Sequence, residues 1–204
     1  MKKIFFLLFG WLTLPHVICY VFAANKHVID KDISRWVKCS KQRNPLGGGK
    51  ILILNLMWLL LFMKEFRNVF YLRMGKKKVF LFYLPPLSSL YIWTKSEKFG
   101  AGTYIQYGFS TVIAADSVGE NCWINQQVTI GWNGSKKYGY GCPTIGNNVR
   151  VSAGAKVCGN VTVGDNSTIG VNAVVIKNVP SDSVVIPSPM MLIQENGERV
   201  YKKL

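Results

Sequence analysis

Histidine is nearly absent from this chain, with two among 204 residues, His16 and His27. Cysteine is also scarce: there are five, an odd number, and no two form a Cys-x-x-Cys pair. This usage argues against a disulfide framework and against a zinc site, and it agrees with a reducing compartment. We therefore expect no bound metal.

Acidic residues are few as well, ten against 25 Lys and Arg, and the imbalance lies in the first half. Residues 1–99 hold 17 basic and 4 acidic residues, a net charge of +13, whereas residues 100–204 hold 8 and 6, a net charge of +2. A basic half is typical of proteins that bind nucleic acid or an anionic membrane surface. Because aliphatic runs lie beside the charges and no nucleic-acid module is recognisable, we expect no nucleic acid as partner.

Two apolar runs occupy this basic half. Residues 4–24 carry no charge, follow Lys2 and Lys3, and contain Pro15. They fit a transmembrane helix, a signal peptide or a helix lying in the membrane interface. Residues 51–63 are too few to span a bilayer. With the basic cluster at residues 76–78, the runs indicate either an anionic membrane surface as partner or a plain helical cap on the rest of the chain.

The second half is dominated by one spacing. Ile or Val recurs at multiples of six residues, a period that fits neither a helix nor a lone strand. A second series of mostly small residues follows four positions after the markers, and glycine often follows a marker directly. A fixed short repeat is typical of a solenoid whose units stack around a shared core. The markers are Val112, Val118, Ile124, Ile130, Ile145, Val151, Val157, Val163, Ile169 and Val175.

Three hexads make one triangular coil, with each marker pointing inward because β-branched side chains suit a buried pleated surface. Ten markers predict about three coils. We expect the glycines near the corners, where they can take positive φ. The alternative, a β-sandwich, would show turns every 8–12 residues instead. The step from Ile130 to Ile145 is nine residues beyond a hexad, so residues 132–144 are expected to project as a loop.

These patterns divide the chain into three parts. Residues 1–99 are expected to be a helical, basic and partly apolar region, with helices at about 25–43 and 52–73 and a break at the glycine-rich segment 45–49. Residues 100–186 are expected to form the β-helix. Residues 187–204 are a polar tail, helical or frayed.

Residues 117–131 (SVGENCWINQQVTIG) and the hexads of residues 145–185 resemble the hexapeptide-repeat acyltransferases. The similarity is to the O-acetyltransferase branch, which includes serine acetyltransferases and the acetyltransferases of surface-polysaccharide clusters. It implies a mainly β fold, a left-handed parallel β-helix of about three coils preceded by a helical region. It also implies acetyl-coenzyme A as acyl donor, a homotrimer with its sites between subunits, and a cytoplasmic location, attached to the inner face of the membrane if the apolar runs bind there.

The family's catalytic histidine is replaced. The resemblance places Tyr107 at that position, which makes it the candidate catalytic residue. Cys142, before Pro143, stands where serine acetyltransferases carry a second histidine. A phenol titrates near ~10 and is a poor base at pH 7, and losing a general base typically costs about 10² to 10⁴ in rate. Three interpretations stay open: a weak or silent enzyme, Tyr107 acting with a neighbouring subunit, or Cys142 acting as a thiolate.

Other site residues follow from the resemblance. Gln106, Gln127 and Cys142 are expected to contact the acceptor, and Gln126 lies beside Gln127. The donor is expected to lie along small residues, which the repeat also requires, and beside one basic residue, which the repeat does not require. Trp123 and Trp132 are candidates for the subunit contact. The expected donor residues are Gly131, Ala153, Gly170 and Lys177.

The resulting hypothesis is an acetyl-coenzyme A-dependent O-acetyltransferase that acts on a sugar hydroxyl of a surface-polysaccharide precursor, or on serine. The alternative is a catalytically silent scaffold that assembles with an active relative.

Overall fold

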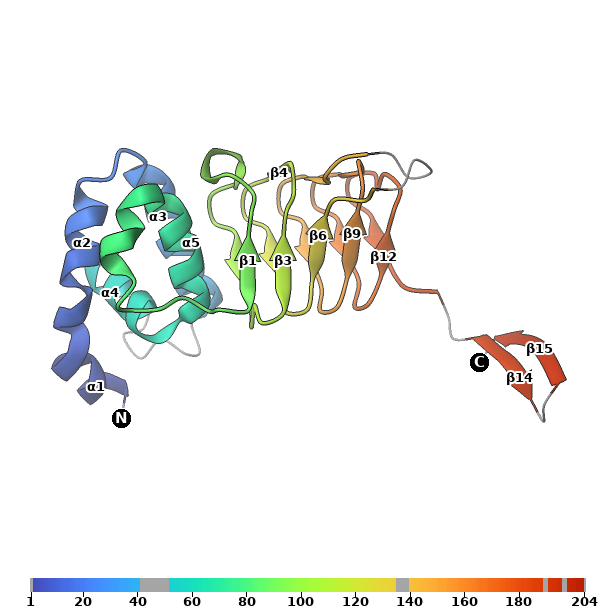
Figure 1. Cartoon of the computed structure of the whole chain (residues 1–204), viewed down its shortest axis with the longest axis horizontal. Coiled ribbons are helices and arrows are strands. Elements are labelled where there is room, and N and C mark those ends of the chain that lie inside the picture. The colour runs from blue at the N-terminus through green and yellow to red at the C-terminus, as the bar shows by residue number, and fades with distance from the viewer. Residues whose placement is uncertain (1, 41–51, 135–139, 189–190, 196–197, 204) are drawn as a thin grey trace.

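The computed structural model describes residues 2–40, 52–134, 140–188, 191–195 and 198–203. A helical domain covers one end of a parallel β-helix, and the chain closes with a two-stranded hairpin (Figure 1). The break expected at residues 45–49 and part of the expected loop, residues 135–139, lie outside the described residues. The tail forms strands β14 (Met191–Glu195) and β15 (Glu198–Lys203), which pair antiparallel, so a helical tail is wrong.

The helical domain contains five α-helices and two 3-10 helices among the described residues. The helix expected over 25–43 is present, and the one expected over 52–73 is divided at Met63, which takes an extended conformation. The first of these two halves is apolar all round and supplies buried Leu56, Trp58 and Leu59. The elements are α1 (Lys2–Phe9), η1 (Gly10–Thr13), α2 (Leu14–Val21), α3 (Lys26–Cys39), α4 (Leu52–Phe62), α5 (Lys64–Met74) and η2 (Gly75–Leu81).

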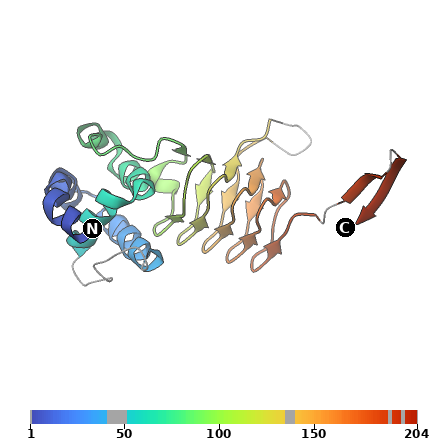
Figure 2. The same cartoon turned by 90° about the horizontal axis from the view of Figure 1, so that it is seen from below.

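Short parallel strands make the β-helix, and Figure 2 shows their coils stacked along one axis. After β1, a short 3-10 helix η3 (Ser96–Lys98) leads into the first turn. The strands are β1 (Leu90–Ile92), β2 (Tyr104–Ile105), β3 (Thr111–Ile113), β4 (Ser117–Val118), β5 (Trp123–Ile124), β6 (Thr129–Gly131), β7 (Thr144–Ile145), β8 (Arg150–Val151), β9 (Lys156–Cys158), β10 (Thr162–Val163), β11 (Thr168–Ile169), β12 (Val174–Val175) and β13 (Val184–Val185).

The strands form three faces. We call them the β6 face (β1-β3-β6-β9-β12), the β7 face (β4-β7-β10) and the β8 face (β2-β5-β8-β11-β13). Single bridges, Phe99 to Val118 and Val163 to Val179, extend the β7 face at both ends. The stack thus contains the three predicted coils and continues beyond them in both directions. It begins at β1, which pairs with β3, and so starts before residue 100.

The core of the coil is the predicted ladder of aliphatic side chains with one correction. Every marker from Val118 onward is buried, as is the second series. Val112 is not the inward residue, because Ile113 is fully buried and pairs in register with Ile130. The step from inward Ile113 to inward Val118 is five residues, with Ala115 buried in the turn, so the regular step of six is shortened by one there.

The glycines after the markers have a different role from the predicted one. Gly119, Gly146 and Gly164 do not take positive φ. The coil residues that do include the glycines Gly102, Gly154 and Gly159 and several asparagines, such as Asn148 and Asn166. Instead, a Cβ on Gly119 would lie 2.5 Å from the carbonyl carbon of Gly146, which belongs to the next coil. These glycines allow the backbones of successive coils to approach each other.

The asparagines form a ladder along the same corner. Asn148 Nδ2 donates to Asn166 Oδ1 at 3.1 Å, and Asn166 Nδ2 donates to Asp182 Oδ1 at 2.9 Å. Asparagine tolerates the left-handed region better than most residues, because its short side chain bonds locally. The corner residues therefore adopt the turn and also bond one coil to the next.

A buried ion pair joins the helical domain to the first coil. Arg73 on α5 donates from Nε to Asp32 on α3 at 2.9 Å, and both side chains are almost fully buried. Asp32 Oδ1 also accepts from the backbone N–H of Gly102 at 2.7 Å. The Nη atoms of Arg73 donate to the carbonyl oxygens of Ser96, Phe99 and Gly100. Each nitrogen of the Arg73 guanidinium and both carboxylate oxygens of Asp32 therefore take part in a hydrogen bond.

We predict that Asp32→Ala lowers the free energy of unfolding by about 3–5 kcal/mol, because it leaves the Arg73 guanidinium buried without its counter-charge. The adjacent Lys31→Ala is the matched control. Lys31 pairs with Glu120 at 3.1 Å, but the Lys31 side chain is 57% exposed and the Glu120 side chain 50% exposed. Its loss should cost less than about 1 kcal/mol. Urea unfolding of both variants measures the difference, and equal losses would contradict the role of the junction.

We predict that Gly119→Ala lowers the free energy of unfolding by about 1–3 kcal/mol, because the added methyl group overlaps the next coil. Gly131→Ala is the control, since a Cβ there has only the Ala114 Cβ as a neighbour, at 3.8 Å. That change should stay within about 0.5 kcal/mol. Thermal unfolding that ranks the two variants in the opposite order would show that the glycines do not set the coil spacing.

Candidate functional site

Tyr107 lies on the turn that connects the β8 face to the β6 face, between β2 and β3. Its backbone takes φ +58°, which a non-glycine residue adopts at a cost, and its side chain is 43% exposed. The carbonyl oxygen of Tyr107 accepts from the N–H of Phe109, which closes a tight turn. Phe109 is 44% exposed, so two aromatic side chains stand partly in solvent on this turn.

Gln127 occupies the same ridge one coil further on. It also takes φ +58°, and its N–H donates to the Phe109 carbonyl oxygen at 3.0 Å. Gln126 beside it has a buried Oε1 without a hydrogen-bond partner among the described residues. The Gln126 carbonyl in turn accepts from Gly154 N at 3.0 Å, which places Ala153 on the following coil. We call this turn, from Tyr107 through Gln127 and Ala153 to Gly170 after β11, the first ridge.

Gln106 points away from the first ridge, onto the outside of the β8 face. Its Oε1 accepts from Trp123 Nε1 at 3.2 Å and from Asn125 Nδ2 at 3.1 Å. The Arg150 guanidinium lies over the Trp123 ring, 5.2 Å from its centroid. The residue therefore belongs to a polar and aromatic cluster with Trp123. Sequence reasoning did not find Asn125 and Arg150; their outward hexad positions were the available signal.

Gly131, Cys142 and Lys177 lie on the next turn, from the β6 face to the β7 face, which we call the second ridge. Gly131 ends β6 and accepts from Gly159 N at 3.0 Å. Lys177 is exposed one coil beyond Gly159. Cys142 is half-buried. The next residue, Pro143, accepts a hydrogen bond at its carbonyl oxygen from the Asp116 N–H at 2.8 Å, which fixes the end of the excursion.

Trp132, at the start of the excursion, is well exposed and stacks on Tyr140 with ring centroids 6.5 Å apart. Trp123 is instead covered by its own chain. Of the two tryptophans expected at a subunit contact, Trp132 is therefore the one that presents an open aromatic face.

Apart from Gln106, the predicted site residues thus fall on two opposite edges of the β6 face. Tyr107, Gln127, Ala153 and Gly170 lie along the first ridge, and Gly131, Cys142 and Lys177 lie along the second. A strand rises about 3.3 Å per residue, so the three residues of β6 separate the two edges by roughly 10 Å. A full face therefore lies between the two groups, and a small acceptor does not reach both within one chain.

Two further cysteines of the coil have thiols with raised pKa values. Cys122 is fully enclosed in the coil, its Sγ donates to the Gly146 carbonyl at 3.1 Å, and burial raises the pKa of the thiol to about 11. Burial also raises the pKa of Cys158, on the outside of β9. Both therefore stay protonated near neutral pH. Within the described residues no group of three or more His, Cys, Asp or Glu side chains could hold a metal ion.

Known sequences similar to this chain are hexapeptide-repeat transferases and serine acetyltransferases. Residues 142–177 match the family described as bacterial transferase hexapeptide (six repeats). A serine acetyltransferase from Synechococcus elongatus is 44% identical over 104 residues, which cover 50% of this chain and 42% of the relative. A serine acetyltransferase from Staphylococcus aureus is 42% identical over 106 residues, which cover 52% and 49%. The matches thus span about half the length of these curated relatives.

Solved structures of similar shape are also serine acetyltransferases. The enzyme of Neisseria gonorrhoeae in complex with serine superposes with a TM-score of 0.56 at 24% identity, covering 79% of this chain and 67% of the other. A serine acetyltransferase in complex with CoA superposes with a TM-score of 0.52 at 24% identity, covering 81% and 70%. At this identity the likeness concerns the fold, and it confirms the predicted left-handed parallel β-helix preceded by helices.

Tyr107 offers a test of the first ridge that does not depend on activity. We predict that Tyr107→Asn is more stable than Tyr107→Val by about 1–2 kcal/mol, because asparagine tolerates the left-handed region and a β-branched residue does not. Chemical unfolding measures the gap. If valine were the more stable of the two, the backbone would not hold positive φ at this corner.

Proposed function

We propose that this chain, which belongs to the hexapeptide-repeat transferase family, is an O-acetyltransferase that takes its acetyl group from acetyl-coenzyme A. The observation that carries the proposal is the sequence similarity: coil residues 142–177 match the family, and 104 residues of the chain are 44% identical to a serine acetyltransferase. In the proposed reaction an acceptor hydroxyl oxygen attacks the thioester carbonyl. The new ester C–O bond forms, the C–S bond breaks, and coenzyme A leaves as the thiol once the hydroxyl proton has been transferred.

The second ridge fits the donor. Gly131 presents no side chain, and the nearest atom to an added Cβ is 3.8 Å away, so a thin pantetheine arm can approach the backbone there. Lys177 is exposed on the same ridge, where its ammonium can pair with the nucleotide phosphates. Ala153 and Gly170 lie on the other ridge. In our proposal they contact donor only when it is bound to a neighbouring subunit.

This separation favours a homotrimer with its sites between subunits. Tyr107 and Cys142 stand on opposite edges of the β6 face, so one chain alone does not assemble the site. A second copy with its second ridge against the first ridge of its neighbour would bring the two groups together. Exposed Trp132, at the base of the excursion, would lie in that contact.

The acceptor we propose is a sugar hydroxyl of a surface-polysaccharide precursor, with serine as the other candidate. Serine is favoured by the names of the relatives. A sugar is favoured by Tyr107 and Phe109, whose half-exposed rings offer flat apolar surface beside Gln127. Aromatic rings of this kind pack against an apolar face of a ligand while the ligand's polar groups stay in contact with water. This arrangement suits a pyranose better than a small amino acid.

A catalytically silent scaffold is the second candidate function, and the same corner favours it. Tyr107 and Cys142 stand where the resemblance places the family's two histidines, so neither imidazole is present. Such a chain would keep the coil and its subunit contacts and would assemble through them with an active relative.

We predict slow transfer from radiolabelled acetyl-coenzyme A by the purified chain, with a panel of sugars and serine as acceptors. Tyr107→His should raise the rate by about 10² to 10⁴, because imidazole is the better base near pH 7. Tyr107→Phe keeps the ring and removes the hydroxyl, so it should abolish the slow transfer if the phenol takes part. Acetate release without acceptor is measured alongside.

No transfer by the wild type or by Tyr107→His, in either case with coenzyme A still bound, would reject the enzyme and favour the scaffold. Transfer to serine alone would reject the sugar as acceptor. A monomer in light scattering that transfers at full rate would contradict a site between subunits.

A further inference from the structure

The first helical stretch of the chain turns its polar side chains toward the protein and its apolar side chains outward. α1, η1 and α2 form a run, Lys2–Val21, that is long and apolar enough to cross a membrane by length and composition. Its polar side chains face the protein: Thr13, His16 and Tyr20 are all buried. A helix on a water-soluble surface normally shows the reverse order, with polar residues toward the solvent.

The inward polar groups are satisfied where they lie. Thr13 Oγ1 donates to the Gly10 carbonyl at 2.7 Å, and His16 Nε2 lies 3.0 Å from the Tyr71 hydroxyl oxygen. Burial lowers the pKa of His16 to about 4, so the ring is neutral at pH 7. Tyr20 bonds the Asp30 carboxylate on α3. These contacts fix which side of the run faces outward.

The outward side of the run is apolar along its whole length. Its side chains recur at helical spacing, and they remain exposed after the domain has packed, Leu7 at 80%. Exposed apolar patches of this extent on a soluble protein mark a surface for a partner or a membrane. The residues are Ile4, Leu7, Leu8, Trp11, Leu14, Ile18, Val21 and Phe22.

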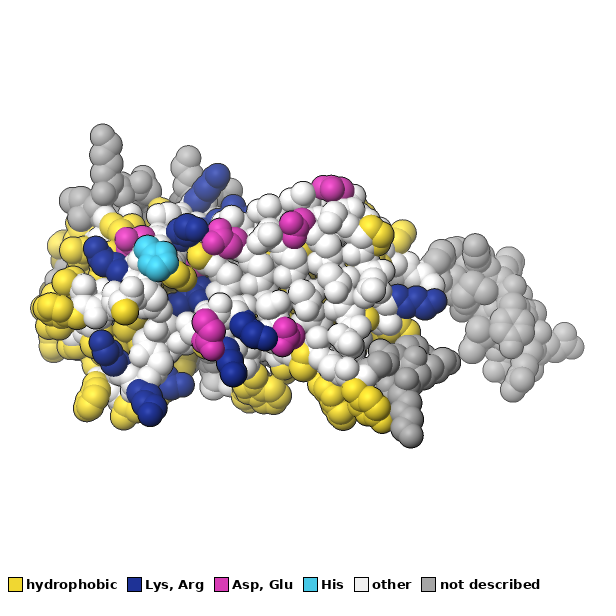
Figure 3. Space-filling model, turned by 90° about the horizontal axis from the view of Figure 1, so that it is seen from above, with side chains coloured by type: hydrophobic (Ala, Val, Ile, Leu, Met, Phe, Trp, Pro, Cys, Tyr) yellow, Lys and Arg dark blue, Asp and Glu magenta, His cyan; other side chains and the backbone are white. Residues whose placement is uncertain are grey.

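The segment η2 and the residues after it extend this surface. Tyr83 OH donates to the Leu12 carbonyl at 2.6 Å, so the segment lies directly against the run. Val79 and Phe80 are exposed, Phe80 at 82%, and they follow the basic cluster at residues 76–78. Figure 3 shows apolar side chains gathered at the end of the helical domain far from the β-helix, with basic side chains among them. We call the run's outward side and these residues together the apolar end.

The charge around the apolar end has one sign. Residues 1–29 and 66–96 contain no Asp or Glu. Lys2 and the lysines at 76–78 lie within these segments, so the charged side chains next to the apolar residues in sequence are all basic there. A second copy of the same surface would bring like charges together. An anionic lipid headgroup layer above a hydrocarbon interior complements both features at once.

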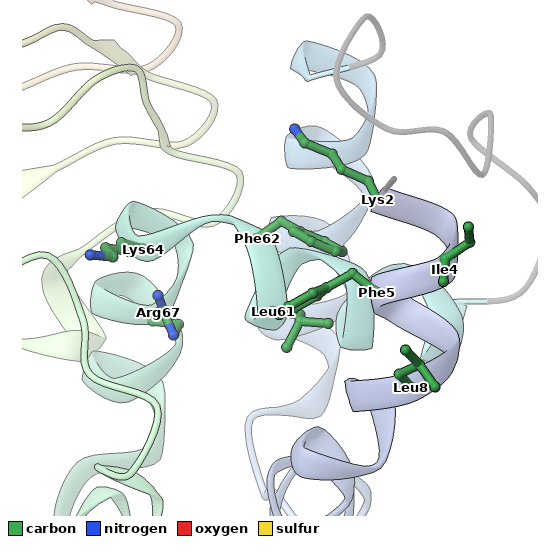
Figure 4. Close-up of a pocket in the computed structure, with 8 residues that line it drawn as sticks. All are labelled: Lys2, Ile4, Phe5, Leu8, Leu61, Phe62, Lys64 and Arg67. Carbon is green, nitrogen blue, oxygen red and sulfur yellow. The ribbon is translucent and has the colours of Figure 1, made fainter.

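A groove within this surface has the same character. It has a volume of about 640 Å³ and lies between α1 and the α4–α5 corner (Figure 4). Phe5 and Phe62 form its apolar wall, with ring centroids 5.7 Å apart, and Lys2 Nζ lies 5.9 Å from the Phe62 ring. Arg67 lines the other end; it is 5% exposed, and its Nε has no hydrogen-bond partner among the described residues.

We propose that the apolar end binds the surface of an anionic membrane, with the run Lys2–Val21 lying in the interface and one acidic phospholipid seated in the groove. The lipid's acyl chains would contact Phe5, Leu8 and Phe62, and its phosphate would accept hydrogen bonds from the basic groups at the rim. The run lies flat, because crossing the bilayer would separate His16 from Tyr71 and Tyr20 from Asp30.

The test is co-sedimentation of the full chain with vesicles. Vesicles of phosphatidylglycerol and phosphatidylcholine should bind it, and phosphatidylcholine alone should bind it far less. Replacing the three lysines at 76–78 with glutamine should weaken binding to the acidic vesicles on the order of 100-fold. High salt should weaken the wild type in the same direction, because it screens the headgroup charge.

A matched pair of variants tests the apolar contribution. Leu7→Gln with Phe80→Gln removes two exposed apolar side chains from the apolar end and should abolish most binding. Val174→Gln with Val184→Gln removes two exposed apolar side chains from the β-helix, 64% and 71% exposed, and should bind like the wild type. Both pairs lie on the surface, so circular dichroism should show that both variants fold.

The depth of Trp11 separates this proposal from its rivals. Vesicles with brominated acyl chains should quench part of the tryptophan emission of the wild type, and Trp11→Phe should lose that part. No quenching, or equal binding by both glutamine pairs, would overturn the proposal. If light scattering instead showed an oligomer that Leu7→Gln with Phe80→Gln dissociates, a second copy would be the occupant.

Discussion

The buried pair of Asp32 and Arg73 is the contact on which the arrangement of this chain depends. It ties α3 to α5, and both to the backbone of the first coil at Gly100 and Gly102. A parallel coil ends in an open row of backbone groups unless something covers it. Here the helical domain covers that end, and the ion pair sets its position relative to the β-helix. The ridges of the coil and the apolar end therefore have a fixed relation in one body.

The coil was predictable because its physics is local and repeated. Each inward position must be β-branched and each corner must be tight, so the period of six predicts the three faces without long-range information. The exceptions are local too. Val112 was one residue off because a single turn is shorter than the rest, and Gly119 serves coil spacing where the hexads suggested a corner conformation. Neither a short turn nor a close backbone approach changes the spacing of aliphatic residues elsewhere.

The candidate site was only partly predictable. The resemblance made Tyr107 and Cys142 candidate site residues, and the fold places them on opposite edges of one face. In the proposed homotrimer, the edges that meet would depend on how the copies assemble, and residues outside the repeat, such as Trp132, are the candidates for that contact. The orientation of Lys2–Val21, with its polar side chains inward, could not be predicted from the sequence either. Hydropathy reports how apolar a helix is and not which of its sides is covered. Orientation emerged only from the partners of His16 and Tyr20.

The excursion between β6 and β7 leaves the ladder undisturbed: Val118 still pairs with Ile145 directly above it, although nine additional residues intervene. The additional residues of that segment therefore leave the register of the stack unchanged. Such a scaffold can exchange one recognition element for another while its folding remains unaffected. Divergence of acceptor choice among chains of this architecture would then need no compensating change in the core.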